Sequence, residues 1–483
     1  MQTIRLIQLW TTIAVLCLAP LFFGSVDQLW VAIWTAALSI ATLCGPTAPI
    51  GVSQRRVLVT FLLVCGAYAL VAVAQVRPDL FARLNDPIWQ RANDLLQLDA
   101  EPRISSRAEI PSVAIGHFLL VVTSFMSGFF VGASRRDSDL LMAFARYSIL
   151  FYAIYGLFAL VFTPNMVLWA PKLAYHGSLT ASFVNHNTAA TYIGAGVILW
   201  FCSAFLAGQN LQFSSLRVLL LTPSNDQVAF KLILRMAAGL VCFFALLLTG
   251  SRGGLICSCL GLLVAIGLML ANRLRPRFWL VIASASLALA LVAGWLSQAG
   301  RIGSQGLFDD GRWAVYGYCI EAIRERPWLG AGAGTFADLF PSLRSATFSS
   351  WGVWDYAHST ILEIAVEMGV PVAALVVLGV ASSLFVLARA ALAARDRSRS
   401  SLAAITGIAV LGYLHSTIDF SLQIPGCLIV FWILLGCWLA RATTERAASE
   451  KTRPRGLAVV RSESAVEGPP LEPSLRKVSA LRK

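Results

Sequence analysis

Long runs of apolar residues recur along the whole chain, and this feature limits the possible folds more than any other. A hydrocarbon core about 30 Å thick is crossed by a helix of roughly 20 apolar residues. Backbone groups find no water there, so each run must satisfy its own hydrogen bonds as a helix. The runs are continuous rather than alternating, which argues against a β-barrel. Of the 483 residues, 57% are hydrophobic and only 13% are charged. The pattern predicts an all-α, polytopic transmembrane helical bundle.

The apolar runs predict about twelve membrane-spanning helices, which form one transmembrane domain over residues 1–441. The first run follows Arg5 and has the length of a signal peptide, but it has no obvious A-x-A cleavage site and a second run follows at once. The predicted helices cover residues 8–24, 29–45, 57–75, 113–133, 146–163, 188–206, 230–249, 254–271, 278–297, 358–388, 401–419 and 425–441. The polar tail over 442–483, which contains Pro, Ser, Arg and Glu, is predicted to be disordered and cytoplasmic.

The net charge of +13 comes from short clusters of Arg and Lys between the apolar runs. Such clusters mark the cytoplasmic side of a membrane protein. The clusters are Arg55-Arg56, Arg135-Arg136, Arg273/Arg275/Arg277 and Arg389/Arg395/Arg397/Arg399. With twelve helices, all four lie on one side together with both termini, so we expect that side to be the cytoplasm. No basic, aromatic-rich soluble face is present, and we expect no nucleic-acid partner.

The opposite side receives one large loop, over residues 298–357. Within it, the segment 312–323 has apolar residues at positions 313, 316, 320 and 323, which share one face of a helix. We expect this helix to lie flat against the membrane or the bundle through that face. The acidic residues Asp309 and Asp310 just before it suit a helix start.

Two arginines on the outer side oppose the usual charge bias. Arg252 lies in the tight turn Gly250–Gly254, and Arg312 opens the predicted helix of the large loop. Arg252 is either a snorkelling anchor of its turn or a cation that faces an anionic substrate. An arginine matches phosphate oxygens with a fork of donors and keeps its charge at any working pH. Two outer arginines beside a histidine would suit a diphosphate.

Outer histidines are the candidates for proton transfer. His358 begins the predicted helix 358–388 and is either an interfacial histidine that water satisfies or a general base, because imidazole titrates near neutral pH. His415 and Asp419 are four residues apart, which places them on one face of the predicted helix 401–419. They form either a second polar pair of the site or a structural hydrogen bond between helices.

Other polar features carry less information. Glu363 and Glu367 are one turn apart and are expected to face other helices, to share a proton, or to mark an ion pathway. The Gly330–Gly334 segment is not a nucleotide-binding motif and is interpreted as a tight turn whose N–H groups could help to hold an anion. Asp137-Ser138-Asp139 is interpreted as a cytoplasmic loop. The ten cysteines show no zinc-ligand spacing and are interpreted as small core residues.

Several motifs in the second half resemble the O-antigen ligase and O-antigen polymerase superfamily of bacterial inner-membrane proteins. The matching segments are Phe183–Ala190, Thr249–Gly254, Gly311–Trp313, Arg326–Gly332, Ala357–Ser359, Glu367–Gly369 and His415–Phe420. Their order and placement around one long outer loop are moderately specific, and together they cover roughly residues 180–440. The first four predicted helices match only in being hydrophobic.

The resemblance implies a periplasmic glycosyltransferase of the GT-C type that acts on glycans carried by undecaprenyl diphosphate. By motif, Arg252 and Arg312 would bind the lipid diphosphate and His358 would take the acceptor's proton, with Asn185, His186, His415 and Asp419 in support. Members need no nucleotide sugar and are thought to need no metal, so we expect no cofactor. Many members that glycosylate proteins carry extra soluble domains, which this chain lacks.

The predicted function is transfer of a lipid-linked glycan to a sugar hydroxyl, as a ligase onto lipid A core in lipopolysaccharide synthesis or as a polymerase of a surface polysaccharide or exopolysaccharide. The alternative is a transporter of small anions or glycolipid. A transporter would be marked by a broken pair of helices with ions at the midplane, and Gly369-Val370-Pro371 is the closest approach to such a break.

Overall fold

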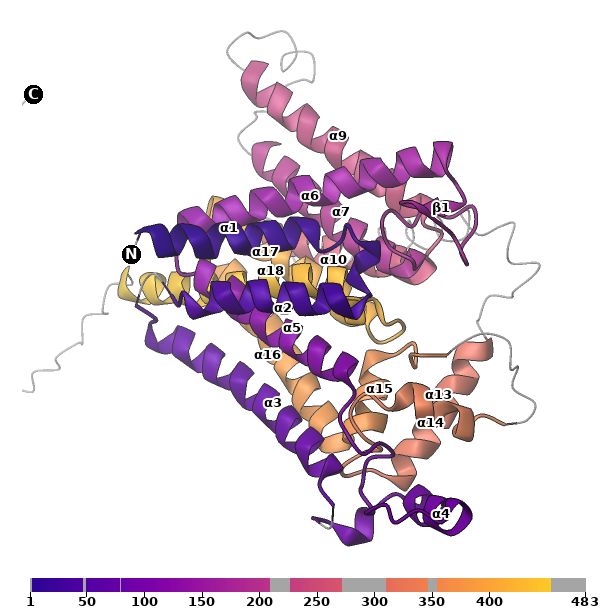
Figure 1. The fold of residues 1–483 in the computed structure, drawn as a ribbon. Helices are drawn as coiled ribbons and strands as arrows, with labels where there is room; N and C mark the ends of the chain where they lie inside the picture. Colours follow the sequence, from indigo (N-terminus) through magenta and orange to yellow (C-terminus); the bar gives the residue numbers. More distant parts are fainter. Residues whose placement is uncertain are drawn as a thin grey trace, which may run out of the picture.

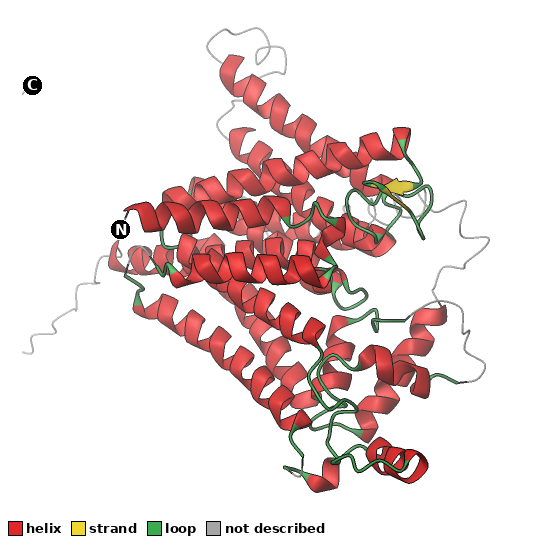
Figure 2. Cartoon of the chain, viewed as in Figure 1, coloured by secondary structure: helices red, strands yellow, loops and turns green. Residues whose placement is uncertain are grey.

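The computed structural model describes residues 2–46, 49–78, 80–208, 226–271, 310–345 and 354–452. Figure 1 shows long helices packed side by side, with a group of short helices against one end of them. Figure 2 shows that strands are almost absent from the described residues. The two strands, β1 (Met166–Val167) and β2 (Ala170–Pro171), pair antiparallel with each other. The predicted all-α class is confirmed.

Eight helices of the described residues are long and apolar enough to cross a membrane. They are α3 (Val52–Val76), α5 (Ser112–Val131), α6 (Arg135–Phe162), α7 (His186–Gly208), α9 (Asp226–Leu248), α10 (Arg252–Leu270), α16 (Val370–Ala393) and α18 (Pro425–Thr452). Two shorter apolar helices, α1 (Gln2–Leu18) and α2 (Gln28–Leu43), pack with them. The helix α17 (Asp396–His415) lies against α10. The predicted helix 278–297 lies outside the described residues.

Short elements occupy the connections. They are η1 (Phe23–Ser25), η2 (Ala82–Leu84), α4 (Pro87–Leu96), α13 (Asp310–Glu325), α14 (Phe336–Leu343), α15 (Thr360–Met368) and η4 (Ser421–Gln423). Three of them, α13, α14 and α15, form a small hydrophobic core of their own around Val315, Phe336 and Val366. The large predicted loop is therefore helical over part of its length.

The prediction of one helix over 358–388 is wrong, because the chain breaks at Gly369. Gly369 has φ +82°, a left-handed conformation that only glycine adopts without strain. A side chain there would overlap the carbonyl oxygen of Trp328. The N–H of Val370 donates to the carbonyl of Pro327 at 2.8 Å. The segment between α13 and α14 contacts this break closely, so α15 ends and α16 starts in a new direction.

Three other helix ends differ from the prediction. The helix α6 begins at Arg135 rather than 146, so Asp137-Ser138-Asp139 lies in its first turns and not in a loop. The helix α17 ends at His415 rather than 419. The helix α18 continues to Thr452, so the predicted tail begins within a helix. Charged residues near these ends extend α6 and α18 beyond the apolar runs on which the prediction rested.

Close backbone contact between α10 and α17 sets the position of the site. A side chain on either Gly261 or Gly407 would overlap the other residue's carbonyl oxygen. Small residues permit such close helix packing in a membrane, where van der Waals contact replaces the hydrophobic effect as the driving force. The start of α10 is thereby fixed beside the end of α17.

The predicted basic clusters that fall on described residues gather at one end of the bundle. Arg5 of α1 forms a bidentate ion pair with Asp137 of α6, with distances of 2.6 and 2.7 Å. Asp139 of α6 pairs with Arg397 of α17 at 3.3 Å. Gln54 of α3 donates to Thr444 of α18 at 2.9 Å. We call this the basic end. The cluster at 273–277 lies outside the described residues.

Candidate functional site

The predicted site residues gather at the end of the bundle opposite the basic end. The helices α7 and α10 begin there and α17 ends there, while α13 and α15 lie beside them (Figure 1). The site therefore combines residues from five helices and the connections between them. Sequence separations of more than 200 residues are bridged, for example between Asn187 and Asp419.

His358 occupies the connection that leads into α15, and its backbone is strained. Its φ of +54° lies in the left-handed region, which non-glycine residues rarely adopt. The hydroxyl of Tyr316 on α13 donates to the His358 carbonyl at 2.9 Å. The ring lies edge-on to Trp354 and Phe420, with ring centroids 5.2 and 4.9 Å away. Such strain at an enclosed polar residue is typical of functional sites.

The imidazole of His358 faces the carboxylate of Asp419. Nδ1 lies 3.9 Å from Oδ1, which is an ion-pair distance but too long for a hydrogen bond. Nδ1 is buried and has no hydrogen-bond partner among the described residues. The side chain of His358 is 19% exposed, whereas that of Asp419 is fully buried. The accessible part of His358 is thus away from the atom that faces the acid.

Hydrogen bonds hold Asp419 in place as a buried anion. Its carboxylate accepts from the side-chain amide of Asn187 at 3.0 Å and from the hydroxyl of Ser421. Burial alone would raise the pKa of Asp419, but the interactions with His358, His415 and Ser421 outweigh burial and lower that pKa to about 2. The site contains a carboxylate that stays ionised at any physiological pH.

The prediction that His415 and Asp419 share one helical face is wrong, because α17 ends at His415. His415 is buried, and its Nδ1 lies 2.6 Å from the hydroxyl of Thr191 on α7. A methyl group on Gly253 would lie 3.1 Å from His415 Nε2, so the start of α10 packs directly on this ring. His415 joins α7, α10 and α17, which is the structural alternative that the sequence left open.

Asn185 and His186 position the start of α7. The side-chain oxygen of Asn185 accepts from the N–H of Asn187 at 2.7 Å. Nδ1 of His186 donates to the carbonyl of Thr249 at 2.7 Å, and its ring stacks on Tyr175. These contacts attach α7 to the turn before α10. They orient Asn187, which sequence reasoning did not single out although it stands in the Phe183–Ala190 motif.

Arg252 and Arg312 lie near His358 and Asp419 and come from different helices. Arg252 is the first residue of α10, directly after the N-cap Ser251 and beside Gly253, which contacts His415. Arg312 lies in the first turn of α13 and donates to the carbonyl of Ile418, next to Asp419, at 3.1 Å. The structure thus brings Arg252, Arg312, His358, His415 and Asp419 into one neighbourhood.

The apolar face of α13, expected against the membrane or the bundle, does not pack on the bundle, and its contact with the membrane stays a prediction. Trp313 and Ile320 are 60% and 43% exposed, whereas Val315, Cys319 and Ala322 are buried. The smaller residues permit α13 to pack closely on α14 and α15, and the larger apolar residues remain outside. The expected helix itself is confirmed.

The two buried glutamates brace the connections on either side of α15 rather than facing other long helices. Glu363 accepts from the N–H of Ala357, next to His358, at 2.7 Å. Glu367 accepts from the N–H of Phe336 at 3.0 Å. Burial raises the pKa of both carboxyls, to about 7 for Glu367.

The glycine-rich segment 330–334 is a tight turn, as expected. Gly330, Gly332 and Gly334 all have positive φ. The N–H groups of Ala331, Gly332 and Ala333 donate to acceptors within the protein. The turn therefore packs against α15 and does not present these N–H groups to an anion.

Comparison with known protein families gives one match in this region. Residues 237–377 match the family model described as O-antigen ligase, a segment that contains Arg252, Arg312 and His358. The search of curated proteins finds no match. The family match confirms the resemblance drawn from the sequence motifs. Together with the eight apolar helices, it identifies a multi-pass bacterial membrane protein.

Proposed function

Because residues 237–377 match the family model described as O-antigen ligase, we propose that the chain transfers an undecaprenyl-diphosphate-linked glycan to a sugar hydroxyl. The acceptor is a lipid A core sugar if the enzyme is a ligase, or the end of a growing glycan if it is a polymerase. The observation that supports this proposal most directly is the pairing of His358 with the buried carboxylate of Asp419 beside two arginines.

His358 is proposed as the general base. A proton on Nδ1 faces the Asp419 carboxylate, 3.9 Å away, and this favours the tautomer in which Nε2 carries a lone pair. The acceptor hydroxyl gives its proton to Nε2 as its oxygen attacks the anomeric carbon. The positive charge that develops on the imidazolium is stabilised by Asp419, which the hydrogen bonds from Asn187 and Ser421 keep in position. A positioned base typically contributes about 10²–10⁴-fold.

The arginines are proposed to bind the departing diphosphate. Guanidinium groups match phosphate oxygens bidentately and balance the charge that develops as the carbon–oxygen bond to the lipid diphosphate breaks. Attack from the face opposite the diphosphate inverts the anomeric centre. With two arginines in this role we expect turnover to need no divalent metal. Activity that disappears in excess EDTA and returns with magnesium or manganese would contradict that expectation.

The site is proposed to face the periplasm from the inner membrane. Arginine clusters favour the cytoplasmic side, and the basic end lies opposite the site. Both termini would then be cytoplasmic, and the segment 298–357 would be periplasmic, where lipid-linked glycans are presented.

The decisive experiment follows lipid-linked glycan in a deletion strain. Accumulation of single repeat units on the lipid carrier identifies a polymerase, and accumulation of full-length chains identifies a ligase. Complementation with the wild-type gene should restore the product, and the His358→Ala gene should not. Surface glycan that is unchanged in the deletion strain would refute the proposal.

The break between α15 and α16 is the one observation that favours a transporter. However, Glu363 and Glu367 beside it already accept backbone N–H groups. Flux of bicarbonate or glycolipid into vesicles that contain the purified protein would support this alternative, and its absence would leave the transferase.

A further inference from the structure

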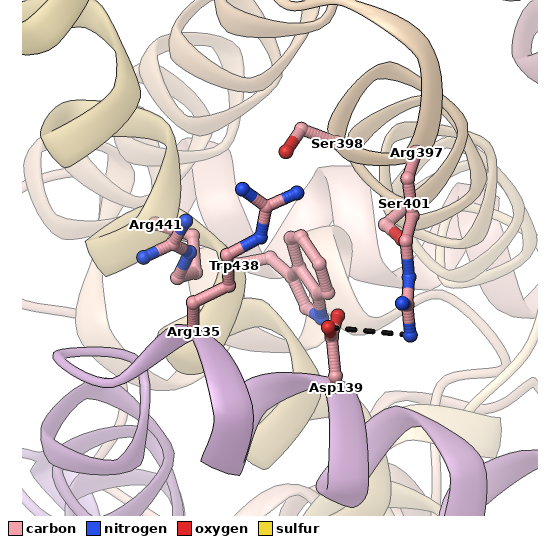
Figure 3. A pocket seen from close by; sticks show the side chains of 7 residues that line it. All are labelled: Arg135, Asp139, Arg397, Ser398, Ser401, Trp438 and Arg441. Carbon is pink, nitrogen blue, oxygen red and sulfur yellow. Dashed lines mark ion pairs between the residues drawn. The ribbon is translucent and has the colours of Figure 1, made fainter.

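A recess at the basic end lies far from the candidate active site and has a composition suited to an anion. Side chains from α6, α17 and α18 surround it, namely Arg135, Asp139, Arg397, Ser398, Ser401, Trp438 and Arg441 (Figure 3). Three arginines and one aspartate line it, and the carboxylate of Asp139 pairs with Arg397 at 3.3 Å. The recess therefore has an excess of two positive charges.

Trp438 supplies a second, independent indication of a ligand. The residue is only 2% exposed, and its indole N–H has no acceptor within the described part of the chain. Buried N–H groups are almost always paired. Since Trp438 lines the recess, an acceptor oxygen would reach this donor once the arginine side chains around it move to bind an anion.

Helix ends and hydroxyls add further donors. The helices α6 and α17 both begin at the recess, at Arg135 and Asp396. Unpaired N–H groups and the helix dipole make such N-termini favourable for anions. Ser398 and Ser401 add hydroxyl groups beside the guanidinium groups. A tetrahedral oxyanion, with several acceptor oxygens and a negative charge, matches this set of donors.

We propose that this recess binds a phosphate group, the natural source of which is the phosphodiester of an anionic phospholipid in the adjacent leaflet. The recess is at the end where arginine side chains gather, and basic pockets between membrane helices on the cytoplasmic side bind anionic head groups. The bound lipid would join α6, α17 and α18. This inference does not depend on the proposed transferase activity.

The test compares two neighbouring arginines. Arg135 and Arg136 are both exposed in the first turn of α6, but only Arg135 lines the recess. Full-length protein in neutral detergent is titrated with phosphatidylglycerol, with phosphatidylcholine and with inorganic phosphate, while the melting temperature is followed. We expect phosphatidylglycerol to raise the melting temperature, and Arg135→Gln to weaken its apparent Kd about tenfold. Arg136→Gln should bind as the wild type does.

A second variant removes the donor and keeps the ring. Trp438→Phe should weaken binding of phosphatidylglycerol several-fold. If Trp438→Phe impairs folding, Ser398→Ala takes its place and should weaken binding in the same way. A response to phosphatidylglycerol alone assigns the site to a lipid head group, and an equal response to inorganic phosphate assigns it to phosphate in general. The proposal is overturned if no probe binds, or if Arg135→Gln and Arg136→Gln weaken binding equally.

Discussion

At the scale of single residues, His358 combines backbone strain with an unusual partner. A left-handed φ at a histidine is retained only where surrounding contacts enforce it. Here Tyr316, Trp354 and Phe420 hold the residue on three sides. The result is an imidazole whose buried Nδ1 faces Asp419 and whose side chain is 19% exposed.

The role of His358 predicts a specific loss. His358→Ala should insert and bind the lipid-linked donor normally, but transfer should fall about 10²–10⁴-fold because the base is missing. Asp419→Asn should also impair transfer, and His415→Ala should impair it less, because His415 joins helices rather than facing the base. Transfer by purified enzyme at neutral pH is the measurement. His176→Ala is the matched control, since the side chain of His176 is exposed and its Nδ1 lies 3.4 Å from the side-chain oxygen of Asn165. Undiminished transfer by His358→Ala would exclude a general base at this position.

The arginines predict a requirement for geometry as well as charge. Arg252→Lys and Arg312→Lys should each lower kcat/KM about tenfold or more, because lysine keeps the charge but loses the bidentate fork. Arg324→Lys, on an exposed position of α13, is the control for Arg312. If both lysine variants retained wild-type kcat/KM for the lipid-linked donor, bulk charge would be sufficient.

Glu367 predicts how stability depends on pH. Burial raises its pKa from 4.5 to about 7 in the folded protein, so the fold favours the protonated carboxyl. Its contribution to the free energy of unfolding is therefore fully present below about pH 4.5 and is lost as the pH rises to about 7. Glu367→Gln keeps an acceptor for the Phe336 N–H but does not titrate. Melting temperatures of the two proteins should agree near pH 4.5, and the variant should be the more stable at pH 8. Parallel curves would contradict this assignment.

At the scale of elements, the break between α15 and α16 sets the position of the connection that carries His358. It separates a short helix, which His358 precedes, from a long helix that crosses the bundle. Glu363 and Glu367 on α15 then fix the connections on either side. A side chain at position 369 would overlap the carbonyl oxygen of Trp328, so glycine at the break leaves room for that segment.

The break predicts a strong effect of a single methyl group. Gly369→Ala should destabilise the protein by roughly 2 kcal/mol or more, because φ +82° strains alanine and the methyl group meets the Trp328 carbonyl. Gly379→Ala is the control, since a methyl group at Gly379 on α16 meets nothing within 4 Å. The readout is the melting temperature in detergent. Equal melting temperatures for the two variants would show that the break does not require glycine.

At the scale of the whole molecule, the two ends of the bundle carry different chemistry. One end gathers arginine clusters and the recess beside Trp438, and the other gathers the site. Separation of this kind suits a protein that uses one face for anchoring and the other for catalysis.

The arrangement predicts topology. An alkaline phosphatase fused after Ser345 should be active, because phosphatase folds only in the periplasm, and a fusion after Thr452 should be inactive. A green fluorescent protein fusion at the same two positions should give the opposite pattern and serves as the control. An inactive phosphatase at Ser345 would reverse the proposed orientation.

The sequence by itself determined the membrane class and most helices, and it pointed to the candidate site residues. Apolar runs of about 20 residues have no stable alternative to helices in lipid. Arg252 and Arg312 were candidates because charges on the side predicted to be outside oppose the usual bias. His358 was a candidate because an imidazole at a predicted helix end, on the same side as these arginines, can act as a general base near neutral pH.

Only the tertiary structure decided which of these groups meet. Asp419 faces His358 and does not share a helical face with His415, because α17 ends four residues before the predicted end. The break at Gly369 follows from contact with a segment about 40 residues away in sequence. Hydropathy describes how each residue partitions between water and lipid. It does not specify which backbone approaches which, and that approach set the ends of the helices and the partners of the site.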